Sequence, residues 1–405
     1  MTGHIALKAA AIAVGLLAAQ AAHADAIKIG VMLPVSGGLA KSGIDAKNGF
    51  ELYWNKVGNE AGGREVEIIV ADTVCNPDNA INAARRLVFN DEVDFLVGPL
   101  CGHEGPAVAQ VSEETGVPLL LVPAAADNQT KWNRIPTVIR TGFSSSQDAH
   151  PFGEYLYNEL GLRNVTFLGQ DYSYGQEKTL GAVETFEALG GTVDEILWAP
   201  LSTNDYAPLL ASIPPGTEAV VPVVVGVHRN RFIETWFDFG YDRQFKLVGL
   251  NLLQADALTD MDDRVVGLIS VAQNYSQGID TPENKAFMDA FVENYSEIPS
   301  YFAEMMYSTA KWAHEAINSI DGNVEDRDAF LQAVRDTEIV GPRGPLKLDE
   351  FDNPIQTTYI SRVEEVDHPK LGPVLMNVPV KAYENVSQFW TWTPEEFLER
   401  GPYTK

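Results

Sequence analysis

Basic residues are scarce in this sequence: 29 Lys and Arg stand against 56 Asp and Glu in 405 residues, which gives a formal net charge of −27. A surface that binds nucleic acid needs clustered Lys and Arg to neutralise phosphates, so this balance excludes nucleic acid as a partner. No run of five like charges forms an acidic tail. We therefore attribute the acidity to the solubility of the surface.

Long apolar segments are also missing after residue 24, where no stretch approaches the ~18 uncharged apolar residues of a membrane-spanning helix. The first 24 residues follow another pattern. Lys8 precedes the apolar run 9–22, and AHA at 22–24 carries the small residues that signal peptidase reads. A run of about 14 apolar residues is too short for a membrane anchor. We predict a signal peptide cleaved after Ala24 and a periplasmic mature chain.

Cysteine occurs only twice, at Cys75 and Cys101. Each lies beside a turn or a strand end: TVCNP follows the apolar run IIV, and LCG follows DFLVGP. An exported chain with two cysteines is expected to oxidise them. A disulfide closing a loop of this size would stabilise the fold by roughly 3–4 kcal/mol. Two reduced, buried thiols are the alternative.

Motifs for catalysis and metal binding are absent. The sequence contains no GxSxG, HExxH or Walker A pattern, which argues against an enzyme. His103, His150, His228 and Cys101 lack the spacing of a metal site. The acidic stretch 260–264 (DMDDR) lacks the twelve-position pattern of a calcium loop and is expected to be a solvated turn. We expect no metal and no cofactor.

The positive signal is an alternation of short apolar runs with amphipathic stretches of helical length, which begins at Ile27 and starts again after Ser144. Such runs fit parallel strands that are buried on both faces and joined by crossover helices. The mature length of about 380 residues suits two domains. Ligands of open α/β sheets bind at the carboxyl ends of strands. The loops that we expect there are 33–43, 100–105, 123–130, 170–175, 226–230 and 249–254.

A series of segments also resembles a known family. IKIGVMLPVSGGLAKSGIDAKNGF, ADTVCNPDNAINAARRLVFNDEVDFLVGPLCG, QDYSYGQE, FDFGYDRQFKLVGLN and IVGPRGPLKLDEFDNP occur in the order and spacing of the leucine/isoleucine/valine-binding proteins. These are type I periplasmic binding proteins that serve ABC importers of the branched-chain amino acid type. The resemblance covers nearly all of the mature chain up to about Tyr383 and leaves the role of the following residues open.

The resemblance implies an α/β fold of two Rossmann-like lobes with parallel sheets, joined by a three-strand hinge and closing around a ligand in the cleft. The first lobe would hold residues 25–144 and 275–355, and the second 145–274 and 356–405. Cys75 and Cys101 are placed as in the family's single disulfide. ABC permease subunits would be the partners of a monomer.

Site residues can be carried over by position. In the first lobe, Gly102 replaces the serine of amino-acid binders, and a loop containing Ala125 and Ala126 replaces a threonine. Backbone N–H groups there, with His103, can still receive a carboxylate. From the second lobe we expect Tyr174, His228 and Asn251 at the ligand, with Phe302 as an apolar wall, whereas Arg229 and Arg231 are expected on the surface. The candidate set is therefore Gly102, His103, Ala125, Ala126, Tyr174, His228, Asn251 and Phe302.

Asn251 is the most informative departure, because amino-acid binders place an acid there to neutralise the ligand ammonium. A buried ammonium without a partner is costly, and asparagine offers only a neutral carbonyl. The hypothesis is a small carboxylate, aromatic or hydrophobic, without an α-amine. Asp127 or Asp171 could supply the missing acid, so binding of branched-chain or other aliphatic amino acids is the alternative. A further alternative is a periplasmic ligand-sensing partner of a separate sensor.

Overall fold

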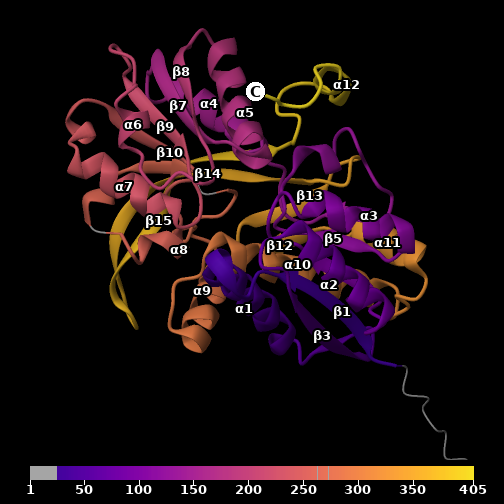
Figure 1. The fold of residues 1–405 in the computed structure, drawn as a ribbon. Coiled ribbons are helices and arrows are strands. Elements are labelled where there is room, and N and C mark those ends of the chain that lie inside the picture. The colour runs from indigo at the N-terminus through magenta and orange to yellow at the C-terminus, as the bar shows by residue number, and fades with distance from the viewer. Residues whose placement is uncertain (1–24, 262, 272) are drawn as a thin grey trace, which may run out of the picture.

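The computed structural model describes residues 25–261, 263–271 and 273–405. The signal peptide predicted for residues 1–24, with its cleavage after Ala24, lies outside them. The described chain forms two α/β lobes side by side (Figure 1). The fold class predicted from the sequence is confirmed.

The first lobe is built on a six-stranded sheet in the order β2-β3-β1-β4-β5-β6, parallel except for the antiparallel pair β2–β3. The apolar runs that form β4 and β5 are buried along their whole length, as expected for central parallel strands. The strands are β1 (Ile27–Leu33), β2 (Glu60–Ala61), β3 (Arg64–Asp72), β4 (Phe95–Gly98), β5 (Leu119–Leu121) and β6 (Val138–Arg140). The helices and 3-10 turns around this sheet are η1 (Gly37–Leu39), α1 (Ala40–Lys56), α2 (Pro77–Phe89), α3 (Gly105–Thr115), η2 (Asp127–Gln129), α9 (Pro282–Tyr295), α10 (Tyr301–Ser319) and α11 (Arg327–Asp336).

The second lobe is built on a sheet in the order β12-β13-β14-β11-β10-β9-β7-β8, with β15 paired to β14. Strands β8, β7, β9, β10 and β11 are parallel, and β14 adds to β11 in the antiparallel direction. The strands are β7 (Asn164–Gln170), β8 (Thr192–Ala199), β9 (Ala219–Val223), β10 (Lys246–Leu250), β11 (Ile269–Val271), β12 (Ile339–Gly341), β13 (Gly344–Leu348), β14 (Pro354–His368) and β15 (Gly372–Val386). The helical elements are α4 (Ala149–Asn158), α5 (Ser173–Ala188), α6 (Ala207–Leu210), α7 (His228–Asp238), η3 (Tyr241–Arg243), α8 (Ala255–Leu258), η4 (Asp263–Val265) and α12 (Pro394–Leu398).

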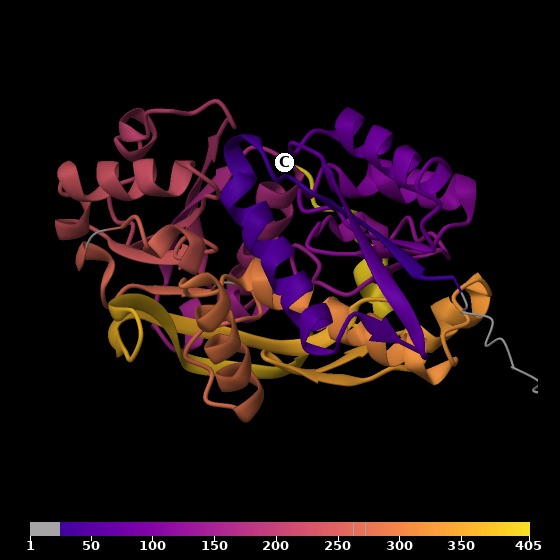
Figure 2. The ribbon, with the colours of Figure 1, turned by 90° about the horizontal axis from the view of Figure 1, so that it is seen from below.

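The chain passes to the second lobe after β6, returns to the helices of the first lobe after β11, and enters the sheet of the second lobe again through β12, β13 and β14, which makes both lobes discontinuous in sequence. Figure 2 shows the long strands of the β14–β15 hairpin running along one edge of the molecule. The lobe boundaries given above stay a prediction. The strand order differs from the expectation at β12 and β13. These strands were expected in the first lobe, but they join the second sheet through β14.

Helix α10 delivers two aromatic residues to the space between the lobes. Its N-cap is Ser300, whose hydroxyl accepts from the backbone N–H groups of Phe302 and Ala303. Ser300 is itself anchored, because its backbone N–H donates to Asp45 Oδ2 of α1 at 3.0 Å. A Cβ on Gly49 would lie 2.0 Å from the Ala303 carbonyl oxygen, so only glycine permits this approach of α1 to α10.

The last residues, 387–405, form a segment that we call the C-terminal strap, which contacts both lobes. On the first lobe, Trp132 Nε1 donates to the Leu398 carbonyl at 3.0 Å. On the second lobe, the Tyr403 hydroxyl donates to the Glu184 carboxylate of α5. Figure 1 shows the strap, in yellow, beside α5. The sequence resemblance, which ends near Tyr383, gave no role for this segment.

Candidate functional site

A cavity of about 420 Å³ lies between the lobes. Its walls come mainly from loops at the carboxyl ends of parallel strands and from the first turn of α10, as the position of ligand sites in α/β folds predicts. The lining residues of the first lobe are Gly38, Leu39, Ser42, Cys75, Leu100, Cys101, Gly102, His103, Pro123, Ala125, Tyr301 and Phe302. Phe143 lies where the chain passes from the first lobe to the second after β6. The lining residues of the second lobe are Gln170, Tyr172, Tyr174, Leu201, Val225, Gly226, Val227, His228, Arg229, Asn251 and Gln254.

Seven of the eight site residues predicted from the sequence meet at this cavity: Gly102, His103, Ala125, Tyr174, His228, Asn251 and Phe302. Their contacts with a ligand stay a prediction. Ala126 is the exception, because it does not line the cavity. Its carbonyl accepts a hydrogen bond of 2.6 Å from Arg140 Nη2 instead, which fixes this part of the loop from behind.

The two predicted histidines are both held by backbone carbonyls. His103 is exposed, and its Nε2 lies 3.1 Å from the carbonyl oxygen of Cys75, so this nitrogen carries the proton. His228, at the start of α7, has Nδ1 3.0 Å from the carbonyl of Thr203. Burial lowers the pKa of His228. The lowered pKa favours the neutral form of the His228 imidazole.

The disulfide between Cys75 and Cys101 is present, with a Cα–Cα distance of 5.7 Å. It ties the loop after β3 to the loop after β4, next to Gly102. Glu104 is buried beneath this loop and accepts from the backbone N–H of Cys101 at 3.1 Å. Burial raises the pKa of Glu104 to about 7.

Aromatic rings form much of the wall. The rings of Tyr301 and Phe302 have centroids 3.9 Å apart, and Phe143 meets Tyr301 edge-on at 6.5 Å. Tyr172 and Tyr174 face them from the second lobe, with centroids 6.0 Å apart. Such walls favour a flat apolar body through area burial and ring–ring contacts.

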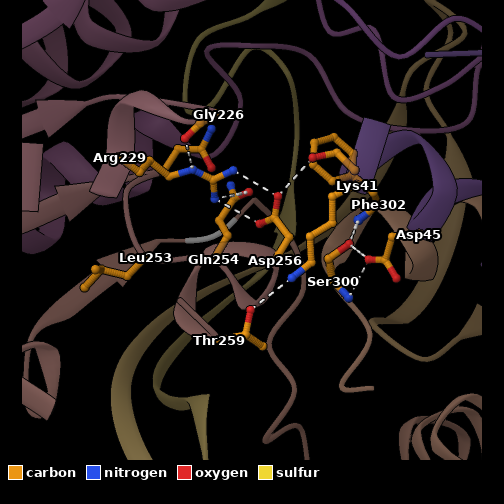
Figure 3. Close-up of polar contacts among 12 residues, drawn as sticks. Lys41, Asp45, Gly226, Arg229, Leu253, Gln254, Asp256, Thr259, Ser300 and Phe302 are labelled. Atoms are coloured by element: carbon orange, nitrogen blue, oxygen red, sulfur yellow. Dashed lines mark hydrogen bonds and ion pairs between the residues drawn. The ribbon is translucent and has the colours of Figure 1, made fainter. Parts of the chain in front are cut away.

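Arg229 contradicts the expectation of a surface position. Its side chain is 3% exposed and that of its partner Asp256 is 6% exposed. Nη1 lies 2.9 Å from Asp256 Oδ1 and Nη2 lies 3.0 Å from Oδ2, a bidentate pair, and Nη1 also reaches Gln254 Oε1 at 3.3 Å. Figure 3 shows the three side chains converging. Arg229 lines the cavity with Asp256 behind it.

Two hydrogen bonds near this pair join the lobes directly. Ser42 of α1 donates to Asp256 Oδ2 at 3.0 Å. Lys41 Nζ donates to the Thr259 hydroxyl at 3.0 Å (Figure 3). Because α1 belongs to the first lobe and α8 to the second, these contacts exist only while the lobes are close together. We call Lys41, Ser42, Asp256 and Thr259 the interlobe latch.

Comparisons with known proteins agree with this geometry. Residues 26–367 match the family model described as periplasmic binding protein. The chain belongs to this family. Its members bind solutes and are not enzymes, and the binding protein is accordingly an ABC-transporter substrate-binding protein. Among residues 25–261, 263–271 and 273–405, no helix is long and apolar enough to cross a membrane.

Individual relatives are similar over most of their length. The binding protein is 28% identical to Leu/Ile/Val-binding protein homolog 6 of Brucella abortus (strain 2308), over 88% of this chain and 92% of that protein. A solute-binding protein of an ABC transporter from Rhodopseudomonas palustris BisB5, solved with 3,4-dihydroxybenzoic acid, is 27% identical with a TM-score of 0.83, over 90% of this chain and 99% of the other. A solute-binding protein from R. palustris solved with 4-hydroxybenzoate is 26% identical with the same TM-score and the same coverage of both chains.

Asn251 is held in the cavity wall of the binding protein by Tyr174. Asn251 Nδ2 donates to the Tyr174 hydroxyl at 2.5 Å, and Gln273 Nε2 donates to the same oxygen at 2.6 Å. Gln273 is oriented in turn by Lys178, which donates to its Oε1 at 2.8 Å and pairs with Asp148. Lys178 and Asp148 are fully buried. This chain of contacts gives Tyr174 and Asn251 fixed positions.

The two acids that the sequence offered as substitutes at position 251 lie elsewhere. Asp127 is buried and paired with Lys131 at 2.9 Å. Asp171 pairs with Lys405 of the strap. Neither lines the cavity, and within the described part of the chain no group of three or more His, Cys, Asp or Glu is arranged to hold a metal.

Proposed function

We propose that the binding protein carries a small aromatic or hydrophobic carboxylate without an α-ammonium group to its permease. The observation that carries this proposal is the charge of the cavity wall. None of the described lining residues is Asp or Glu, whereas Arg229 is among them. A ligand ammonium would be buried there beside a guanidinium and without an acidic partner, at a cost of several kcal/mol.

The aromatic walls and two related structures support the same ligand class. Tyr301, Phe302 and Phe143 present ring surface to the cavity, which suits a planar body. The Rhodopseudomonas palustris proteins solved with 3,4-dihydroxybenzoic acid and 4-hydroxybenzoate are 27% and 26% identical to this chain. For the carboxylate we propose the backbone N–H groups of Gly102 and His103 as receivers, because both residues line the first-lobe side.

The first 24 residues and the family bear on where the protein works. We propose that residues 1–24 are a signal peptide cleaved after Ala24 and that the mature protein works in the periplasm as a monomer. The apolar run after Lys8 and the family's exported members support this. Lobe rotation around a bound ligand would make and break the interlobe latch, and the permease would distinguish the two states by their shape.

Branched-chain amino acids remain the second candidate, because the Brucella relative carries Leu/Ile/Val-binding in its name. In this protein an ammonium would have to displace Arg229 from Asp256, which is bonded through both carboxylate oxygens. Binding of the ammonium would then leave a buried guanidinium unpaired. The cost of breaking the Arg229–Asp256 pair makes binding of an ammonium less favourable than binding of a carboxylate.

Calorimetry and thermal unfolding of the mature protein test the proposal. Benzoate, 4-hydroxybenzoate, an aliphatic carboxylate, leucine and valine are compared. A ligand at 100 times its Kd stabilises the folded state by about 2.7 kcal/mol, which a thermal scan resolves. The proposal expects stabilisation by an aromatic acid and none by leucine. Tight leucine or valine binding, with the aromatic acids inert, overturns it.

A further inference from the structure

Three amide side chains in the cavity wall, those of Gln170, Asn251 and Gln254, each have one polar atom without a partner among the described residues, and Asn251 and Gln254 lie on the same loop. Asn251 is 1% exposed and Gln254 is 2% exposed. Asn251 Oδ1 and Gln254 Nε2 have no hydrogen-bond partner among the described residues. Buried polar atoms are nearly always paired, so an unpaired acceptor and an unpaired donor on one loop of a ligand cavity indicate groups kept for the ligand.

The orientation of Gln254 follows from a neighbour that can only donate, and that of Asn251 from the hydrogen bond that its Nδ2 makes to the Tyr174 hydroxyl. Arg229 has no acceptor atom, so the oxygen of Gln254 faces Arg229 Nη1 and the NH₂ group is turned away. Lys178 orients Gln273 in the same manner, which directs Gln273 Nε2 to the Tyr174 hydroxyl. Asn251 Nδ2 donates to this hydroxyl as well. Asn251 Oδ1 is thus left as the free acceptor and Gln254 Nε2 as the free donor.

An acceptor and a donor together select a neutral group that can both donate and accept. A carboxylate would satisfy Gln254 but place its negative charge against Asn251 Oδ1. An ammonium would satisfy Asn251 but meet the NH₂ of Gln254 and the guanidinium of Arg229. A hydroxyl donates to Asn251 Oδ1 and accepts from Gln254 Nε2, so it satisfies both.

We propose that Asn251 and Gln254 form a hydroxyl subsite, so that the preferred ligand is an aromatic carboxylate bearing a hydroxyl group away from its carboxylate. This inference rests on the proposed function and adds the specificity-determining residues. Asn251 and Gln254 lie on the second-lobe loop after β10, whereas Gly102 and His103 belong to the first lobe. A ligand that spans the cavity would meet one set of groups at each end. Lacking the hydroxyl, benzoate would leave both amide atoms unpaired and bind more weakly.

The substitution Asn251→Gly provides a clean test. Asn251 has φ +66°, a left-handed conformation that glycine adopts without strain, so the variant removes the amide and keeps the backbone. Asn385→Gly is the matched control, because Asn385 also has a positive φ of +55°, is exposed and lies outside the cavity. Thermal unfolding of both variants verifies that they fold.

Calorimetry of the full mature protein compares benzoate, 3-hydroxybenzoate, 4-hydroxybenzoate, 4-methoxybenzoate and terephthalate. We expect one hydroxybenzoate to bind at least about 10-fold more tightly than benzoate, and the methoxy and dicarboxylate compounds to bind more weakly than it. Asn251→Gly should lose most of this preference, while Asn385→Gly keeps it. Equal affinity for benzoate and both hydroxybenzoates, tighter binding of terephthalate, or an unchanged preference in Asn251→Gly overturns the subsite. If no aromatic acid binds, the proposed function itself fails, which is a separate outcome.

Discussion

Replacing Asp256 with asparagine removes the negative charge beside Arg229 and keeps the volume of the side chain. The guanidinium is 3% exposed and makes both of its short carboxylate contacts to this one residue. Removing one partner of a buried ion pair typically costs 3–5 kcal/mol, because the other charge stays buried and uncompensated. The asparagine oxygen keeps one hydrogen bond to Arg229, so we expect a loss of about 3 kcal/mol in the free energy of unfolding of the ligand-free protein.

Urea denaturation at pH 7 measures this loss. Far-UV circular dichroism follows the secondary structure of the whole chain, and fluorescence follows the tertiary environment of its seven tryptophans, one of which, Trp236, is buried on the same helix as Arg229. Coincidence of the two transitions shows that a single free energy is meaningful. The double variant Arg229→Met with Asp256→Leu is the control. It removes both charges and should recover most of the stability, as apolar replacements of buried pairs do.

The same variant also distinguishes the two ligand classes. With Asp256 neutralised, the uncompensated charge of Arg229 favours an anionic ligand while the weakened Ser42 contact opposes binding, so we expect carboxylate affinity to stay within about 10-fold of that of the unmodified protein. If Asp256 were the contact for a ligand ammonium, leucine would bind the unmodified protein and lose affinity in the variant. Unfolding of Asp256→Asn at the same urea concentration as the unmodified protein would refute the buried pair as described.

Three further predictions concern the latch, the disulfide and the pH dependence of stability. Ser42→Ala removes one hydrogen bond between the lobes and should weaken ligand binding by about 2- to 10-fold in calorimetry. Lys41→Met should have a smaller effect in the same direction. Unchanged ligand affinity in both variants would exclude a latch. Reduction of the disulfide should lower the free energy of unfolding by about 3–4 kcal/mol, and two alkylatable thiols in the unreduced periplasmic protein, detected by mass spectrometry, would contradict its formation. Burial raises the pKa of Asp45 from 3.8 to about 7, so the folded state holds a proton that the unfolded state releases, and the free energy of unfolding falls as the pH rises through this window. The free energy of unfolding of Asp45→Asn should therefore increase relative to that of the unmodified protein between pH 5 and pH 8. A difference between the two proteins that does not change with pH would disprove the raised pKa.

Much of the fold and the loops that surround the site follow from local sequence patterns, whereas the individual site residues were carried over from the family resemblance. The alternation of apolar runs and amphipathic stretches is enough to predict parallel strands and crossover helices, because burial on both faces imposes its own composition. Loops at the strand ends then converge whatever their sequence, which is why Gly102, Tyr174 and Asn251 all line the cavity as predicted. The two cysteines lie in adjacent loops for the same reason.

The missed features depend on pairings between distant residues. Nothing in the local pattern HRNR shows that Arg229 turns inward, because its burial depends on Asp256, 27 residues later. Ala126 was included for its backbone N–H, but the loop is fixed from behind by Arg140, whose contact is with the carbonyl. Gln254 could have been noted from its position three residues after Asn251 on a strand-end loop. Its significance appears only when its oxygen is seen to face Arg229.

The contacts of the C-terminal strap with the two lobes include two tryptophan side chains, Trp132 and Trp392. Trp132 of the first lobe packs against Phe397 of the strap with ring centroids 6.0 Å apart, and Trp392 of the strap packs against His150 of the second lobe at 5.3 Å. If the lobes rotate on ligand binding, the strap can keep its contacts with only one of them. At least one of the two indoles must then change its surroundings, so a shift in tryptophan emission registers ligand capture in real time without any attached dye.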